Sequence, residues 1–256
     1  MSDTRGRRDR DGRGTPRAPK RGVEPVRERR SAPATPARTS GAGHLSGGTL
    51  PAWVVEEVGR VAPGERGRQA IAHLEEAVTA FVGGRYGRAL QQAEQGKESA
   101  PRDPTMREVI GLSAYRLGRW EQALAELRTF RRLAGDTTHL PVEMDVLRAL
   151  ERDQDVEVAW VLLRRLGGER TTMNEARVVY GSFLLDRDRA REAWEVTRPR
   201  RIGGEADESE LRVWYVASRA AARIGDLATA RRLYEVIQAE DPAFPGLDDL
   251  ERALSS

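Results

Sequence analysis

The sequence predicts an all-α protein built from repeated helix pairs, and three observations support this fold class. The good helix formers Ala, Leu, Arg and Glu dominate the 256 residues. No long segment alternates polar and β-branched residues, as a half-buried strand would. A similar residue pattern recurs about every 34 positions from residue 70 onward, which is typical of helical repeat proteins.

The charges divide the chain into a basic tail and a mildly acidic body. Residues 1–50 hold 12 Lys and Arg against 5 Asp and Glu, and they are rich in Arg, Gly, Pro, Ser and Thr. The remaining residues hold 31 basic against 35 acidic side chains. Because such a tail cannot bury enough apolar surface to offset its ordering entropy, we expect residues 1–50 to be disordered. Residues 51–256 are expected to form the folded body.

Several classes of protein are disfavoured by composition. The chain has no cysteine, which excludes disulfides, thiolate zinc sites and a cysteine nucleophile. It has no run of about 18 apolar residues that could span a membrane, and its basic N-terminus lacks the apolar region of a secretory signal. We therefore expect a cytoplasmic protein without a membrane segment.

A short apolar-patterned segment precedes the repeats. It runs from Trp53 to Val58 and is interrupted by Pro63-Gly64. We expect it to form a helical turn or two that covers the open end of the following array. A second short segment, residues 247–254, keeps a helical period after the last repeat and is predicted to be a C-terminal capping helix.

The repeat register is clearest at a glycine turn and at an alanine five residues later. Gly84 and Ala89 recur 34 residues on as Gly118 and Ala123. The alanine series continues with Ala159, Ala193 and Ala230, and the segments Asp153–Asp155 and Asp186–Asp188 replace the glycine turn in units three and four. The predicted units are residues 70–103, 104–138, 140–173, 174–206 and 211–244.

Each recurring position has a physical reason. A glycine after the first helix accepts a positive φ and ends that helix at little cost. Asp226, after the last of these glycines, is a plausible N-cap for the second helix. The alanine lies where the two helices of a unit cross closely, so a bulkier residue would overpack the crossing. Pro101 and Pro242 end second helices because proline lacks the amide donor.

This spacing resembles the tetratricopeptide repeat (TPR), most clearly in residues 211–242. The positions that match are Trp214, Ala217–Ser218, Ala230, Tyr234 and Pro242. The resemblance covers roughly residues 70–242, and the whole chain is similar to small TPR proteins of high-GC bacteria with a basic disordered tail. It implies about five helix pairs stacked into a right-handed solenoid with a concave groove.

No pattern of catalytic or metal-binding residues stands out. The three histidines, His44, His73 and His139, are far apart and lack a metal-ligand spacing. No phosphate-binding loop is present, and Gly83–Gly87 is explained by its place in the repeat. Ser182 follows a glycine but lacks the second glycine of a nucleophile elbow. We expect a non-catalytic protein without a cofactor or a metal.

The resemblance also implies which residues line the groove, because the first helix of each TPR unit faces it. The side chains placed there are Tyr115, Arg116, Arg148, Arg152, Tyr215, Arg219 and Arg223. Arginines in a groove favour an acidic or carboxylate-bearing peptide, since guanidinium pairs bidentately with carboxylate. In the alternative interpretation these arginines pair with acids of the chain itself, such as Glu108, Glu151 and Asp186.

Two functions from different classes therefore remain open. The leading hypothesis is a scaffold that binds a protein or peptide segment in the groove. The alternative is a nucleic-acid-associated protein that uses the basic tail, with the repeats serving for dimerisation or recruitment. The tail could also be only a solubilising segment, and the sequence predicts neither the identity of the partner nor the oligomeric state.

Overall fold

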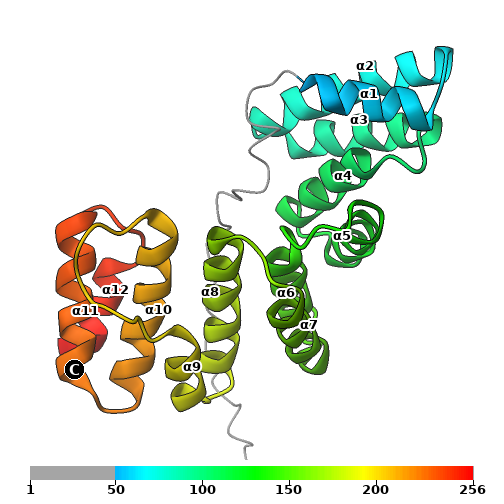
Figure 1. The fold of residues 1–256 in the computed structure, drawn as a ribbon. Helices are drawn as coiled ribbons and strands as arrows, with labels where there is room; N and C mark the ends of the chain where they lie inside the picture. Colours follow the sequence, from blue (N-terminus) through cyan, green and yellow to red (C-terminus); the bar gives the residue numbers. More distant parts are fainter. Residues whose placement is uncertain (1–49, 256) are drawn as a thin grey trace, which may run out of the picture. The chain divides into compact units, whose positions relative to one another are not determined.

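The computed structural model describes residues 50–255, and within this range all the regular structure is α-helical (Figure 1). Its twelve helices are α1 (Ala52–Val61), α2 (Glu65–Val82), α3 (Tyr86–Ser99), α4 (Pro104–Arg116), α5 (Trp120–Ala134), α6 (Leu140–Ala149), α7 (Asp153–Leu166), α8 (Arg170–Asp186), α9 (Ala190–Thr197), α10 (Glu208–Arg223), α11 (Leu227–Glu240) and α12 (Leu247–Ser255). The predicted all-α fold is confirmed for this part of the chain. The tail predicted to be disordered, residues 1–50, lies outside the described residues except for Leu50.

Ten of these helices form five consecutive pairs, α2 with α3, α4 with α5, α6 with α7, α8 with α9, and α10 with α11. The two helices of each pair pack on one another, and the second helix of a pair also contacts the first helix of the next. The short helices α1 and α12 pack at the two ends of this series, α1 against α2 and α12 against α10 and α11. The first pair begins at Glu65, five residues before the predicted start of unit one.

The turns within the five pairs share one backbone conformation. One residue in each turn has a φ between 57° and 88°, and these residues are Gly84, Gly118, Glu151, Asp188 and Gly225. The amide of the next residue donates to the carbonyl five residues before it, at 2.8–2.9 Å in all five turns. This hydrogen bond satisfies a carbonyl that the end of the first helix would otherwise leave without a partner.

The third turn corrects the register expected from the sequence. Glu151 takes the position of the turn glycine, whereas Asp153–Asp155 form the first turn of α7. The residue five positions after the turn is therefore Val156, and the assignment of Ala159 to this position was wrong. Asp188 lies within the segment predicted for the fourth turn.

Small residues allow a close helix crossing in four of the five pairs. Their turn alanines, Ala89, Ala123, Ala193 and Ala230, are fully buried. On the facing first helices, a Cβ added to Gly111 would lie 2.7 Å from a Leu127 carbon, and one added to Gly181 would lie 2.5 Å from Thr197. The third pair differs, because Met144 occupies the position of Gly111 and Gly181. With Val156 it fills the third crossing with larger side chains.

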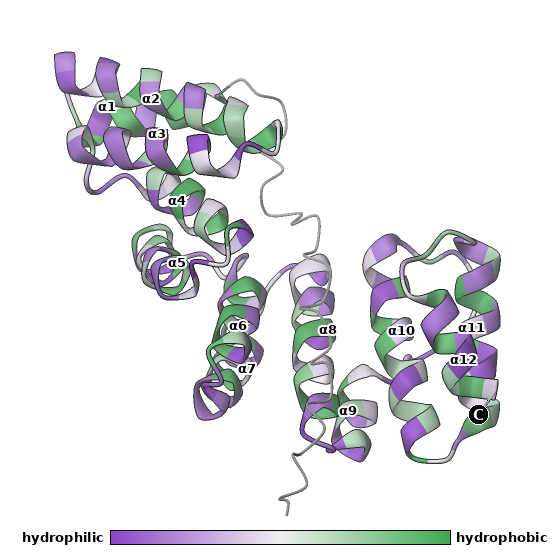
Figure 2. Ribbon diagram, turned by 180° about the vertical axis from the view of Figure 1, so that it is seen from behind, coloured by the Kyte–Doolittle hydropathy of each residue, from purple (hydrophilic) through white to green (hydrophobic). Residues whose placement is uncertain are grey.

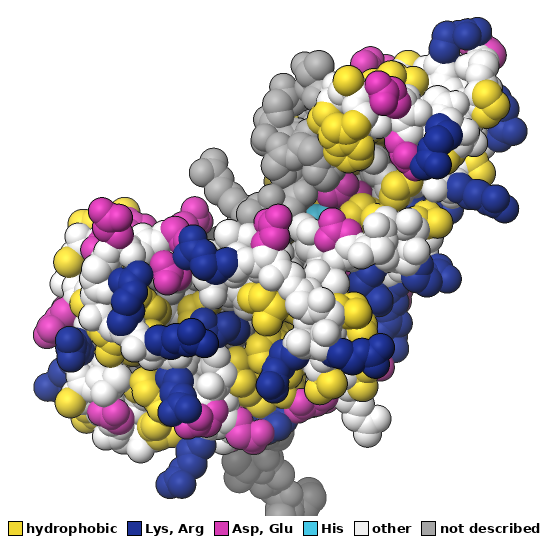
Figure 3. Space-filling view, viewed as in Figure 1, with side chains coloured by type: hydrophobic (Ala, Val, Ile, Leu, Met, Phe, Trp, Pro, Cys, Tyr) yellow, Lys and Arg dark blue, Asp and Glu magenta, His cyan; other side chains and the backbone are white. Residues whose placement is uncertain are grey.

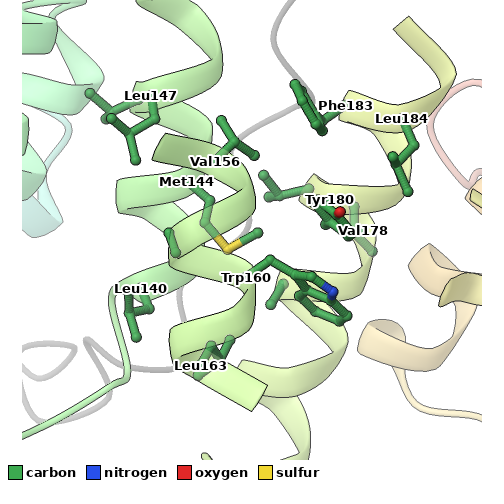
Figure 4. Close-up of a cluster of buried hydrophobic side chains, with 14 of the residues drawn as sticks. Leu140, Met144, Leu147, Val156, Trp160, Leu163, Val178, Tyr180, Phe183 and Leu184 are labelled. Atoms are coloured by element: carbon green, nitrogen blue, oxygen red, sulfur yellow. The ribbon is translucent and has the colours of Figure 1, made fainter. Parts of the chain in front are cut away.

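The largest buried cluster connects α6, α7 and α8 (Figure 4). Its members include the fully buried Met144, Val156 and Leu163, and Trp160 stacks on Tyr180 with ring centroids 4.8 Å apart. Along most helices hydrophobic and hydrophilic residues alternate, as amphipathic helices require (Figure 2). The core therefore continues from one helix pair to the next.

Three helices of the described range begin with an aspartate that accepts a backbone hydrogen bond. Asp103 caps α4, Asp207 caps α10 in a capping box with Glu210, and Asp226 caps α11 as the sequence predicts. Asp103 is fully buried, and burial raises its pKa to about 6 although the amide of Met106 donates to it. This cap is therefore sensitive to pH.

We predict that Asp103 makes the free energy of unfolding depend on pH. The pKa is about 6 when folded and about 3.9 when unfolded, so between these values the folded state binds the proton more tightly. Stability from this group is present below pH 4 and lost as the pH rises through 6, by about 3 kcal/mol. Asp103→Asn keeps the cap acceptor and should remove this dependence in urea unfolding measured from pH 4 to pH 7. Parallel pH profiles for the two proteins would contradict the prediction.

Candidate binding surface

Most of the seven predicted groove residues lie near the ends of first helices or in the turns that follow them, whereas Tyr215 lies in the middle of α10. Tyr115 and Arg116 are the last two residues of α4, Arg148 lies in the last turn of α6, Arg152 is the N-cap of α7, and Tyr215, Arg219 and Arg223 lie on α10. Arg152 is therefore in a turn and not on a first helix. The contacts of each side chain show which of them remain available to a partner.

Tyr115 and Arg148 are brought together by a buried carboxylate, Asp145. The Tyr115 hydroxyl donates to Asp145 Oδ2 at 2.6 Å, and Arg148 Nη1 donates to Asp145 Oδ1 at 2.7 Å. Burial and the neighbouring Asp145 charge raise the pKa of Tyr115, so its hydroxyl stays protonated and keeps donating. The three side chains form a hydrogen-bonded network between α4 and α6.

Arg148 and Arg223 both contact the C-terminal end of α8, although they come from different helices. Arg148 Nε donates to Asp186 Oδ2 at 2.9 Å. Arg223 Nη1 donates to the carbonyl of Leu185 at 2.8 Å and lies 3.3 Å from Asp188 Oδ1. Cations are favourable at the C-terminal end of α8, because the C-terminus of a helix carries partial negative charge. These bonds join the first helices α6, α8 and α10 to one another.

The arginines around the third and fourth turns have the same role. Arg187, the residue after α8, pairs through both its Nε and Nη2 with Asp153 at 2.7 Å. Arg189, the N-cap of α9, pairs with Glu157, which also accepts the Tyr180 hydroxyl. Both pairs connect residues about one repeat apart in sequence.

Most of the predicted groove arginines are thus paired within the chain. The alternative interpretation is confirmed for Arg148 with Asp186, whereas Glu108 is hydrogen-bonded to His139 at 2.7 Å. The Arg152 Nε donates to Asp155 Oδ2 at 2.6 Å. In the face shown in Figure 3, basic side chains lie among acidic and hydrophobic ones and form no continuous basic surface.

Two of the five arginines in this set, Arg116 and Arg219, have no carboxylate partner within residues 50–255. Arg116 lies over the ring of Tyr86, with its guanidinium carbon 5.3 Å from the centroid. Arg219 lies over the ring of Tyr215 at 5.9 Å, and the Tyr215 ring in turn lies 5.6 Å from that of Phe244. Stacking uses the face of a guanidinium and leaves its N–H groups able to donate. The N–H groups of Arg219 are therefore not used by a carboxylate of the described part of the chain.

A shallow cleft between α7, α8 and α9 was not expected from the sequence. It encloses about 300 Å³, and its lining residues are Trp160, Tyr180, Leu184, Arg191, Glu192, Glu195 and Val196. Two of these lining residues, Trp160 and Tyr180, are the stacked aromatic pair described above. The position of the third turn was not predicted correctly from the sequence. The stacking of Trp160 on Tyr180 could therefore not be predicted either.

The part of the chain that the structure describes shows neither a metal site nor a membrane segment. No three His, Asp or Glu side chains there are arranged to hold a metal ion. None of its helices is long and apolar enough to cross a membrane. No protein-family model matches the sequence, and no curated protein matches it.

We predict that Arg148 and Arg152 differ strongly in their effect on stability. Arg148→Met leaves the buried Asp145 carboxylate without its cation and should lower the free energy of unfolding by about 3 kcal/mol. Arg152→Met removes only an exposed pair with Asp155 and should cost less than about 1 kcal/mol. Urea denaturation of both variants measures the difference. Equal losses would show that the Arg148 network is not structural.

Proposed function

We propose that this chain is a TPR-like helical-repeat scaffold, a right-handed solenoid of five helix pairs that binds a protein or peptide segment in its groove. The observation that carries the proposal is the shared turn. Five turns with one positive-φ residue and the same backbone hydrogen bond support a common structural unit. Stacked units of this kind act by presenting an extended surface to a partner.

The contacts narrow the surface that we propose for binding. Arg148, Arg152 and Arg223 already pair with carboxylates of the chain, so a partner would have to replace those bonds. Tyr215 and Arg219 are free of this cost. Tyr215 offers a half-buried aromatic surface and Arg219 offers guanidinium donors, so together they suit an acidic or carboxylate-bearing segment.

We predict that the full chain binds acidic peptides through Arg219. The probe is a set of fluorescent peptides of equal length and graded negative charge, measured by anisotropy. Arg219→Glu should reduce the affinity for the most acidic peptide at least tenfold, because it places like charges together. The matched control is Arg232→Glu, which makes the same charge change at an exposed position of α11.

The outcomes separate the proposal from its rivals. Absence of binding to every peptide, or an equal loss in both variants, would contradict the groove site. The second candidate function, nucleic-acid binding through residues 1–50, is favoured by their excess of 12 basic over 5 acidic residues. It would appear as binding to labelled duplex DNA that falls steeply with salt and is unaffected by Arg219→Glu.

A further inference from the structure

The outer face of α7 is apolar, whereas the same face of the other second helices carries polar side chains at seven of eight compared positions and an alanine at the eighth. In each second helix, the residues seven and ten positions after the positive-φ residue of the turn lie on this face. They are Val158 and Val161 for α7, and Gln91 and Glu94, Ala125 and Arg128, Glu195 and Arg198, and Arg232 and Glu235 for the other four pairs. Val158 is 64% exposed and Val161 62% exposed.

This face extends along α7 and is separate from the face that packs in the core. Leu162, partly buried, and Leu166, 53% exposed, continue the stripe at helical spacing. The opposite side of α7 is occupied by Val156 and Leu163, which are fully buried. A helix that is apolar on two opposite sides is usually buried on both of them. The outer stripe therefore needs a cover that the described part of the chain does not provide.

The charges of α7 indicate what covers it. Its first turn carries Asp153 and Asp155, and its last turn carries Arg164 and Arg165. The two aspartates pair within the chain with Arg187 and Arg152, but these ion pairs are exposed and therefore weak, so the aspartates can also meet the arginines of another copy. A second α7 that runs antiparallel to the first would place the acidic start of each helix beside the basic end of the other. The apolar stripes would then face each other, and the two helix dipoles would be opposed. A parallel arrangement would place like charges together.

We propose that two copies of this chain associate through antiparallel α7 helices, with the two-fold axis passing near Val161. Such an interface is self-complementary, because each copy offers the same patch to the other. Arg165 has no carboxylate partner within residues 50–255 and is available for a bond across the interface.

Substitution at the axis tests the arrangement directly. In the full chain, Val161→Glu places two carboxylates opposite each other, and Val161→Arg places two guanidinium groups there. Sedimentation should show a concentration-dependent dimer of the 28.5 kDa wild-type chain and at least a tenfold higher dissociation constant for each variant alone. An equimolar mixture of the two variants should restore the dimer, because opposite charges then meet. The control is Ala125→Glu, an exposed apolar-to-acidic change on α5, which should leave the dimer unchanged.

A cross-link provides a second measurement that does not depend on charge. Because the chain has no cysteine, Val161→Cys introduces a single thiol. Mild oxidation should convert this variant, and not Ala125→Cys, to a covalent dimer. A wild-type chain that stays monomeric at its highest soluble concentration would overturn the proposal. A dimer that survives both Val161 substitutions, or variants that fail to re-associate when mixed, would overturn the two-fold arrangement.

Discussion

The arrangement of the helices depends on one backbone constraint, the positive-φ residue in the turn of each pair. At that residue the chain leaves the first helix, and the next amide closes the helix end by donating to a carbonyl five residues back. The second helix then starts at a fixed distance from the turn, so the buried residue five positions on meets the first helix at their crossing. This residue is alanine in four pairs and Val156 in the third. The turn thus sets which side chains can enter the core.

The same constraint explains why arginines near the turns form bonds between neighbouring helix pairs. Residues near the turns of neighbouring pairs recur at about one repeat length, so an arginine of one pair reaches a carboxylate or carbonyl of the next. Arg148 reaches Asp186 in this way, Arg187 reaches Asp153, and Arg223 reaches the end of α8. Arginines that look available for a partner when one unit is considered alone are therefore paired with a neighbouring unit. Arg219 is stacked on Tyr215 and has no carboxylate partner within residues 50–255, which is why we propose that a partner binds there.

Much of the fold could be predicted from the sequence, because helix propensity and the glycine turns are local signals. The third turn could not, since Glu151 replaces the glycine and Val156 replaces the alanine. The sequence nevertheless held a signal for the position of the third turn, because an arginine follows the positive-φ residue at both Gly118 and Glu151. The pairing of Arg148 with Asp145, three residues before it, was also readable from helical spacing. The hydrogen bonds between helix pairs and the exposed apolar face of α7 depend on how the units stack. No local sequence pattern predicts them.

The most direct test of the account is the free energy of unfolding of Gly225→Ala beside that of Asp188→Gly, both at turn positions with positive φ. An alanine at Gly225 has open space around it, so only its backbone is strained, and the loss should be about 1 kcal/mol. A glycine at Asp188 relieves strain and gives up only an exposed ion pair, so stability should be unchanged or rise by up to about 1 kcal/mol. Gly87→Ala, inside α3, serves as the control and should be neutral or stabilising. Loss of stability on Asp188→Gly together with none on Gly225→Ala would contradict the equivalence of the five turns.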